Sequence, residues 1–273
     1  VWVLYLLWQL ANMVLNYFFI VRFGWGAWGA GLGTALAEWF SLLTSIAAVW
    51  FYWKGFPLFD KQRILHWPEF KVLLSLNSAI MLRTFMLMSV LSAFTNISAT
   101  ISTIALAANA LMMKLYIFSA FVLDGYSIAL ETLAGQSLGR KNKEQLKRAL
   151  SLTYQWSAGS SLAFILLYVV AAGWVLSLLT EHAEIIAAAL PYVPWLCATI
   201  FLGAFAFTLD GFFYGLAKPK LLFYSMTLAG IAFAPPAYYA WLNKDSTLLW
   251  IAFVVFTAVR VTTLLPAAQK AVR

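Results

Sequence analysis

The sequence is dominated by long apolar stretches, each close to the length that an α-helix needs to cross a lipid bilayer. We place eight of them at about residues 2–22, 30–53, 73–97, 104–134, 150–179, 186–217, 220–242 and 247–268. About 20 mostly apolar residues span the hydrocarbon core as a helix. Only 10% of the residues are charged, whereas soluble domains are about one quarter charged. The pattern predicts an all-α integral membrane protein, a polytopic helical bundle of about eight transmembrane helices.

The short connections between these stretches alternate in charge. Positive residues gather in every second connection and at the end of the chain, namely Lys54, Lys61, Arg63 and Lys71; Arg140, Lys141, Lys143, Lys147 and Arg148; Lys218 and Lys220; Lys270 and Arg273. Basic loops of membrane proteins lie mainly on the cytoplasmic side. We therefore predict a multi-pass protein of the cell inner (plasma) membrane, with both chain ends cytoplasmic. The net charge of +8 indicates this topology and not a nucleic-acid partner.

Seven charged residues fall inside the apolar stretches, where each would cost at least about 2.5 kcal/mol in lipid. They are Glu38, Arg83, Lys114, Asp124, Glu131, Asp210 and Arg260. Such residues are expected to face the bundle interior or a wet cavity, as in a transport path. We predict an intramembrane charge network of Arg83, Asp210, Arg260 and Glu38, with Asp124 at a similar depth to the first three. The network either holds the bundle together or takes part in gating or coupling.

Features that often mark other functions have simpler explanations here. Gly24–Gly29 fits the GxGxxG dinucleotide pattern, but its two tryptophans and its position between two apolar stretches indicate a membrane interface. One cysteine, Cys197, and two distant histidines, His66 and His182, offer no metal site. Because no catalytic arrangement is visible, we expect no enzyme activity, no cofactor and no metal. The expected partners are the lipid bilayer and small molecules.

Glycines and prolines within the stretches predict close packing and bends. Gly29 and Gly33 are four residues apart, as are Gly135 and Gly139, and small residues at this spacing let helices approach closely. Prolines interrupt the sixth stretch at 191 and 194 and the seventh at 235 and 236. Because proline removes a helical hydrogen bond, these sites are either static kinks or hinges.

Three sequence blocks follow one another along the chain. The first holds Asn12, Asn16 and the glycine-rich run 25–38; the second holds Asn77–Arg83, Leu123–Tyr126, Glu131 and Gly135–Gly139; the third is Leu209–Leu216. The Leu-Asp-Gly and Gly-Gln-x-x-Gly motifs at this separation resemble those of the multidrug and toxic compound extrusion (MATE) transporters, specifically the DinF-like branch. The resemblance covers essentially the whole chain.

Members of this family have twelve helices in two six-helix lobes, and this chain resembles helices five to twelve. The resemblance implies that the four N-terminal helices are missing and that residues 1–53 are the last two helices of the N-lobe. It also implies a cytoplasmic inter-lobe linker at 54–72 and a six-helix C-lobe at 73–273. The complete protein would be a monomer. The chain alone would be inactive, since two of its helices lack their neighbours.

By the same resemblance, the complete protein would be a secondary active antiporter. It would expel organic cations or amphipathic drugs and metabolites in exchange for protons or sodium. The alternative is a lipid-linked saccharide flippase of the same superfamily, which usually has a strongly basic cavity. Acids outnumber bases within the apolar stretches, so the antiporter is favoured.

Some family members bind the coupling ion with an Asn and an Asp four residues apart on the fifth helix. The matching positions here are Asn12 and Asn16, and an amide does not titrate in the relevant pH range. We therefore expect coupling or cavity roles for Asn12, Asn16, Lys114, Asp124 and Glu131, the last three on the eighth family helix. Lys114 could instead snorkel to the membrane surface or pair with an acid on an absent helix.

The alternation of charge also predicts which loops are accessible from outside. Cysteines introduced at Lys61 and Lys143 should resist an impermeant thiol reagent in intact cells, because both loops are predicted to be cytoplasmic. A cysteine introduced at His182, in a connection with two glutamates, should react. Labelling at position 143 from outside would contradict this topology.

Overall fold

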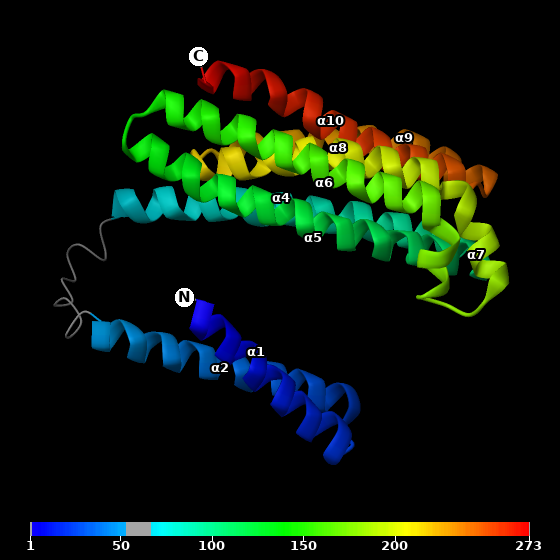
Figure 1. Ribbon diagram of the computed structural model, residues 1–273, viewed down its shortest axis with the longest axis horizontal. Coiled ribbons are helices and arrows are strands. Elements are labelled where there is room, and N and C mark those ends of the chain that lie inside the picture. Colours follow the sequence, from blue (N-terminus) through cyan, green and yellow to red (C-terminus); the bar gives the residue numbers. More distant parts are fainter. Residues whose placement is uncertain (1, 53–66, 273) are drawn as a thin grey trace. The chain divides into compact units, whose positions relative to one another are not determined.

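The computed structural model describes residues 2–52 and 67–272, and every regular element in these ranges is a helix (Figure 1). The chain divides into two compact units, Val1–Trp67 and Pro68–Arg273. Within the described ranges, eight helical segments are long and apolar enough to cross a membrane. This confirms the all-α bundle that the hydropathy pattern predicts.

The first unit is a helical hairpin. Helix α1, Trp2–Asn16, continues directly into a π-helical turn, η1, Tyr17–Arg22, and α2, Gly26–Tyr52, packs back against it. Where the chain turns from η1 into α2, Gly24 has a φ angle of +69° and Gly26 has a φ angle of +52°. Glycine adopts such angles readily because it has no Cβ. Gly24 and Gly26, the first two glycines of the GxGxxG match, therefore serve the chain reversal.

Gly29 and Gly33 bring the two helices of the hairpin into close contact. A Cβ on Gly29 would lie 2.8 Å from the carbonyl oxygen of Phe19, and a Cβ on Gly33 would lie 2.5 Å from Oδ1 of Asn16. Only a residue without a Cβ lets the helices approach this closely. The predicted packing role of this pair is confirmed.

The second unit holds the remaining helices of the described chain. They are α4, Trp67–Ile101, which starts at the boundary; α5, Thr103–Gly139; α6, Lys143–Ser177; α7, Ala183–Ala189; the 3₁₀ turn η2, Leu190–Tyr192; α8, Val193–Gly215; α9, Pro219–Asn243; and α10, Ser246–Val272. Helices α5 and α8 pack together, α6 packs on both, and α10 packs on α8 and α9. Phe94, Tyr168, Phe212, Trp250 and Phe253 are among the fully buried side chains. Many other large apolar side chains remain exposed, as expected for a surface covered by lipid.

Several helices run further than the hydropathy pattern predicts, and α4 and α6 show the cause. Helix α4 continues through residues 96–101, and only Ser102 separates it from α5, whose Ala105 N–H donates to the Ser102 side chain at 3.0 Å. Helix α6 begins after Asn142, which accepts from the Gln145 N–H at 2.9 Å. The predicted connections at 96–102 and 139–148 are therefore wrong in extent. Capping side chains set these helix ends, and a fall in hydropathy does not.

Proline acts differently in the sixth and seventh apolar stretches. The sixth is broken, since α7 ends at Ala189, η2 contains Pro191, and α8 begins with Pro194 in its first turn. The predicted interruption is confirmed there. Pro235 and Pro236 lie inside helix α9, which continues through them, so the seventh stretch is not divided into two helices there. A kink at these prolines stays a prediction. Hinge motion at either place stays a prediction.

Helices α5 and α8 cross almost backbone to backbone. A Cβ on Gly211 would lie 2.2 Å from the carbonyl oxygen of Ser127, and a Cβ on Gly215 would lie 2.4 Å from that of Glu131. Gly135 also packs here, with 3.5 Å between its ideal Cβ and the carbonyl oxygen of Gly215. The predicted packing role is thus confirmed for Gly135. It is wrong for Gly139, whose ideal Cβ meets nothing within 4 Å.

Replacing Gly211 by alanine should destabilise the second unit, because the added methyl group meets the main chain of Ser127 and forces the helices apart. We expect a loss of about 1–3 kcal/mol, the usual range for overpacking, seen as a lower Tm in detergent. Gly159→Ala in α6 is the matched control, since nothing lies within 4 Å of its ideal Cβ. Equal Tm values for the two variants would contradict the close crossing.

Candidate functional site

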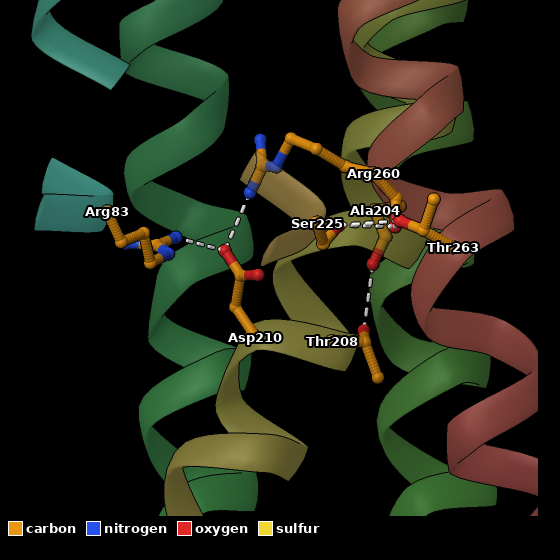
Figure 2. A network of polar contacts seen from close by, with 7 residues as sticks. All are labelled: Arg83, Ala204, Thr208, Asp210, Ser225, Arg260 and Thr263. Atoms are coloured by element: carbon orange, nitrogen blue, oxygen red, sulfur yellow. Dashed lines mark hydrogen bonds and ion pairs between the residues drawn. The ribbon is translucent and has the colours of Figure 1, made fainter. Parts of the chain in front are cut away.

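Asp210 on α8 lies between two arginines that come from other helices (Figure 2). Nη2 of Arg260, on α10, is 2.6 Å from Oδ2 of Asp210, and Nη2 of Arg83, on α4, donates to the same oxygen. The side chains of Asp210, Arg260 and Arg83 are 5%, 3% and 12% exposed. One carboxylate therefore connects three helices. We call Arg83, Asp210 and Arg260 the triad.

Aromatic rings surround the two guanidinium groups of the triad. The guanidinium of Arg83 lies 5.5 Å from the ring centre of Tyr214. That of Arg260 lies 5.7 Å from the ring centres of Phe207 and of Phe256. Cation–π contacts are stronger where water is excluded. The rings therefore add to the stabilisation of two charges that Asp210 alone cannot neutralise.

Near the triad, the hydroxyl groups of Ser225 and Thr208 donate hydrogen bonds to main-chain carbonyl oxygens. Ser225 of α9 donates to the carbonyl oxygen of Arg260 at 3.3 Å and lies 2.6 Å from the hydroxyl of Thr263 (Figure 2). On α8, Thr208 donates to the carbonyl oxygen of Ala204 at 2.8 Å. The contacts of Ser225 join α9 to α10 beside the triad. They hold the helix that carries Arg260 in register with its neighbour.

A cavity of about 380 Å³ opens beside the triad. Its wall combines the ionisable groups Arg83, Asp124, Glu131 and Asp210 with Ser127 and Tyr214, and with the apolar side chains of Leu87, Ile117, Ala120, Phe121, Ile128 and Phe207. Ligand sites in proteins commonly have this size and a mainly apolar wall with a few polar groups. We call this space the triad cavity.

Two acids of the triad cavity are not used by the triad. Asp124 is half-buried and Glu131 is exposed. Neither makes an ion pair with a residue that the structure describes. Among the described residues that line the cavity, one is basic, Arg83, and three are acidic. The wall of the cavity therefore carries net negative charge when its groups are ionised.

The close crossing of α5 and α8 explains why these residues meet. Asp124, Ser127 and Glu131 are spaced by three and four residues, so they share one face of α5. Asp210 and Tyr214, four apart on α8, likewise share a face. Because Gly211 lets α8 approach Ser127 closely, the two faces line one cavity. Ser127 and Tyr214 were not predicted as cavity residues, although their spacing from Asp124 and Asp210 indicates them.

Lys114 does not line the triad cavity, and Glu38 belongs to the first unit. Lys114 is exposed on α5, about 15 Å along the helix axis from Asp124. Glu38 is exposed on α2, in the first unit. Neither forms an ion pair with any residue in the described ranges. Their predicted roles in coupling and in the charge network therefore stay predictions.

Asn12 and Asn16 face one another on α1, and Nδ2 of Asn16 donates to Oδ1 of Asn12 at 3.0 Å. Oδ1 of Asn16 is buried against Gly33 and has no hydrogen-bond partner among the described residues. The π-helical turn η1 begins one residue later, and such turns often mark functional sites. The Asn16 oxygen is thus able to accept a hydrogen bond or contribute to an ion site.

Removing the charge of Asp210 should destabilise the protein strongly. Asp210→Asn leaves Arg83 and Arg260 facing each other without a counter-charge, which for a buried pair costs about 3–5 kcal/mol. Asp124→Asn is the matched control, because it makes the same chemical change in the same cavity at a residue that forms no ion pair with the described part of the chain. It should cost less than about 1 kcal/mol. Denaturation in detergent measures both values, and equal losses would contradict a special role for Asp210.

Sequence comparison places the chain with known membrane transporters. The family model described as MatE matches residues 79–239, more than half of the chain. DNA damage-inducible protein F of Escherichia coli (strain K12) is 30% identical over 254 residues, which cover 92% of this chain and 55% of that protein. The chain therefore spans about half the length of this curated relative.

Solved structures share the same fold. A mutant of the Vibrio cholerae MATE transporter VcmN matches with a TM-score of 0.86 at 18% identity, over 98% of this chain and 61% of that chain. A MOP superfamily transporter from Pyrococcus furiosus matches with a TM-score of 0.81 at 18% identity, over 99% and 62% of the two chains. The sequence motifs, the family model and the fold agree, and the chain belongs to the MatE family of membrane transporters.

Proposed function

We propose that this chain supplies part of a secondary active antiporter that exports organic cations or amphipathic compounds in exchange for protons or sodium. The triad cavity carries the proposal. Two of its acids, Asp124 and Glu131, have no ion-pair partner among the described residues and lie in a mainly apolar wall. Family membership supports transport as the activity.

The triad cavity has the chemistry to hold an amphipathic cation. Asp124 and Glu131 provide carboxylates, while Phe121, Phe207 and Tyr214 provide aromatic rings. A cation against such a ring gains about 0.5–2 kcal/mol, depending on how far water is excluded. The aliphatic part of the wall suits the apolar body of the same compound. The Asp210 carboxylate is less available to the compound, because two arginines already bind it.

Antiport follows if ion and substrate compete for one carboxylate. A proton or sodium ion on Asp124 would cancel the charge that attracts a cationic substrate, so each ligand would lower the affinity for the other. A cavity that opens alternately to the two sides then exchanges one ligand for the other. Lys114 has a smaller part in this proposal because it does not line the cavity.

The charge of the triad cavity favours an antiporter over a lipid-linked saccharide flippase. The phosphates of such a lipid would need several basic residues in the cavity, whereas the described lining contains one, Arg83. Arg83 is itself bound to Asp210. Asp124 and Glu131 would repel a phosphate that came close.

The arrangement in the membrane is a further part of the proposal. The complete protein would be a monomer in the inner membrane, with the basic connections and both ends of this chain in the cytoplasm. Residues 1–53 would belong to one lobe, and residues 73–273 would form the other. The boundary between the two compact units supports this division. Residues 54–66 of the predicted linker lie outside the described residues.

Neutralising Asp124 should impair ion-driven efflux. In proteoliposomes of the complete protein, we expect Asp124→Asn to lower efflux of a cationic dye about tenfold, which corresponds to a loss of about 1.4 kcal/mol in binding. Glu144→Gln, the same kind of change at an exposed acid of α6 outside the cavity, is the matched control and should retain efflux. Lys114→Met tests the coupling role that the sequence predicts for Lys114. Unchanged proton-driven and sodium-driven efflux in both Asp124→Asn and Lys114→Met would place coupling elsewhere in the protein.

A further inference from the structure

One end of the second unit is strongly basic. The turn between α5 and α6, the start of α6, the turn between α8 and α9 and the end of α10 all lie at this end (Figure 1). Within residues 140–149, 217–220 and 265–272, eight bases face one acid, Glu144; the bases are Arg140, Lys141, Lys143, Lys147, Arg148, Lys218, Lys220 and Lys270. A polytopic helical protein places such an end at the surface of the bilayer, among the lipid headgroups.

A groove between the start of α6 and the end of α10 opens at this basic end. It encloses about 410 Å³ and is lined by Lys147, Leu150, Ser151, Tyr154, Leu265, Ala268, Gln269 and Val272. Lys147 lies nearest the start of α6, and Tyr154 lies about 10 Å deeper along the helix. The groove therefore has a cationic group at its outer end. Leu150 and Leu265 give its deeper wall an apolar character.

A second cavity lies on the other side of the first turn of α6. It encloses about 360 Å³, and three lysines, Lys141, Lys143 and Lys218, line it together with Asn142 and Ala271. Positive charge thus extends across both sides of the α6 start. A negative group held beside Lys147 would lie in the combined field of these lysines, where each base adds to the attraction.

We propose that the groove between α6 and α10 binds one anionic glycerophospholipid of the adjoining membrane leaflet. The phosphate lies beside the ammonium group of Lys147, with Ser151 and Gln269 as hydrogen-bonding neighbours. An acyl chain lies along Leu150 and Leu265. A free phosphate would leave this apolar wall uncovered, whereas a lipid has both a charged and an apolar part in the order in which the groove presents them.

This proposal goes beyond transport and does not depend on the triad cavity. The positive-inside pattern alone accounts for basic residues at a membrane surface. It does not account for a groove that pairs one of these bases with an apolar wall between two helices. Arg148 separates the two explanations, because it neighbours Lys147 on α6, is likewise exposed, and lines neither cavity.

The test measures lipid binding to the purified, complete protein in detergent. Dioleoylphosphatidylglycerol and dioleoylphosphatidylcholine are titrated separately, bound lipids are counted by native mass spectrometry, and Tm is recorded in parallel. We expect one tightly bound phosphatidylglycerol and a preference over phosphatidylcholine. Lys147→Gln should weaken phosphatidylglycerol binding about fivefold, the contribution of one lysine near the membrane surface. Arg148→Gln should leave it within about twofold of the unchanged protein.

A second variant fills the groove without changing its charge. Ser151 is exposed, so Ser151→Trp should fold normally, place its ring in the groove and abolish tight binding of phosphatidylglycerol. Three results would overturn the proposal. They are equal binding of the two lipids, equal effects of Lys147→Gln and Arg148→Gln, and tight phosphatidylglycerol binding that survives Ser151→Trp. Stabilisation by inorganic phosphate to the same extent would show that the acyl chain has no part and would also overturn it.

Discussion

An ionised carboxylate can stay inside a membrane bundle only if positive groups compensate for the water that it loses. Asp210 meets this condition through two arginines that bind the same oxygen, one from α4 and one from α10. Because the three side chains come from three helices, none of these helices can shift without leaving a charge unpaired. Oδ2 of Asp210 therefore helps to fix the positions of α4 and α10 relative to α8, in addition to the apolar packing between these helices.

A second constraint, purely steric, fixes the position of α8 relative to α5. Gly211 and Gly215 let α8 rest on the main chain of α5, so the distance between the two helices is set by the absence of side-chain atoms. The steric contact and the charge contact adjoin each other, since Asp210 immediately precedes Gly211. Together they place the acids of α5 beside the triad. The triad cavity is thus a consequence of the contacts that hold α4, α5, α8 and α10 together.

The sequence predicted the helices and the paired charges better than it predicted their surroundings. Hydropathy located all eight stretches to within a few residues at most ends, but the caps at Ser102 and Asn142 depend on single side chains that a hydropathy average does not register. Depth in the bilayer was enough to group Arg83, Asp210 and Arg260. The direction in which Lys114 points around its helix was not available from depth. Ser127 and Tyr214 are uncharged in the neutral pH range, so a pattern of charged residues does not indicate them.

The crossing at Gly211 also limits how the protein can recover from damage there. The atoms that a new side chain would meet at position 211 include the carbonyl carbon and oxygen of Ser127, which belong to the main chain. Every amino acid carries those atoms, so no exchange at position 127 can make room. A genetic screen for second-site suppressors of a Gly211 variant should therefore recover changes that reposition α5 or α8 as a whole, and none that act by trimming the opposing residue.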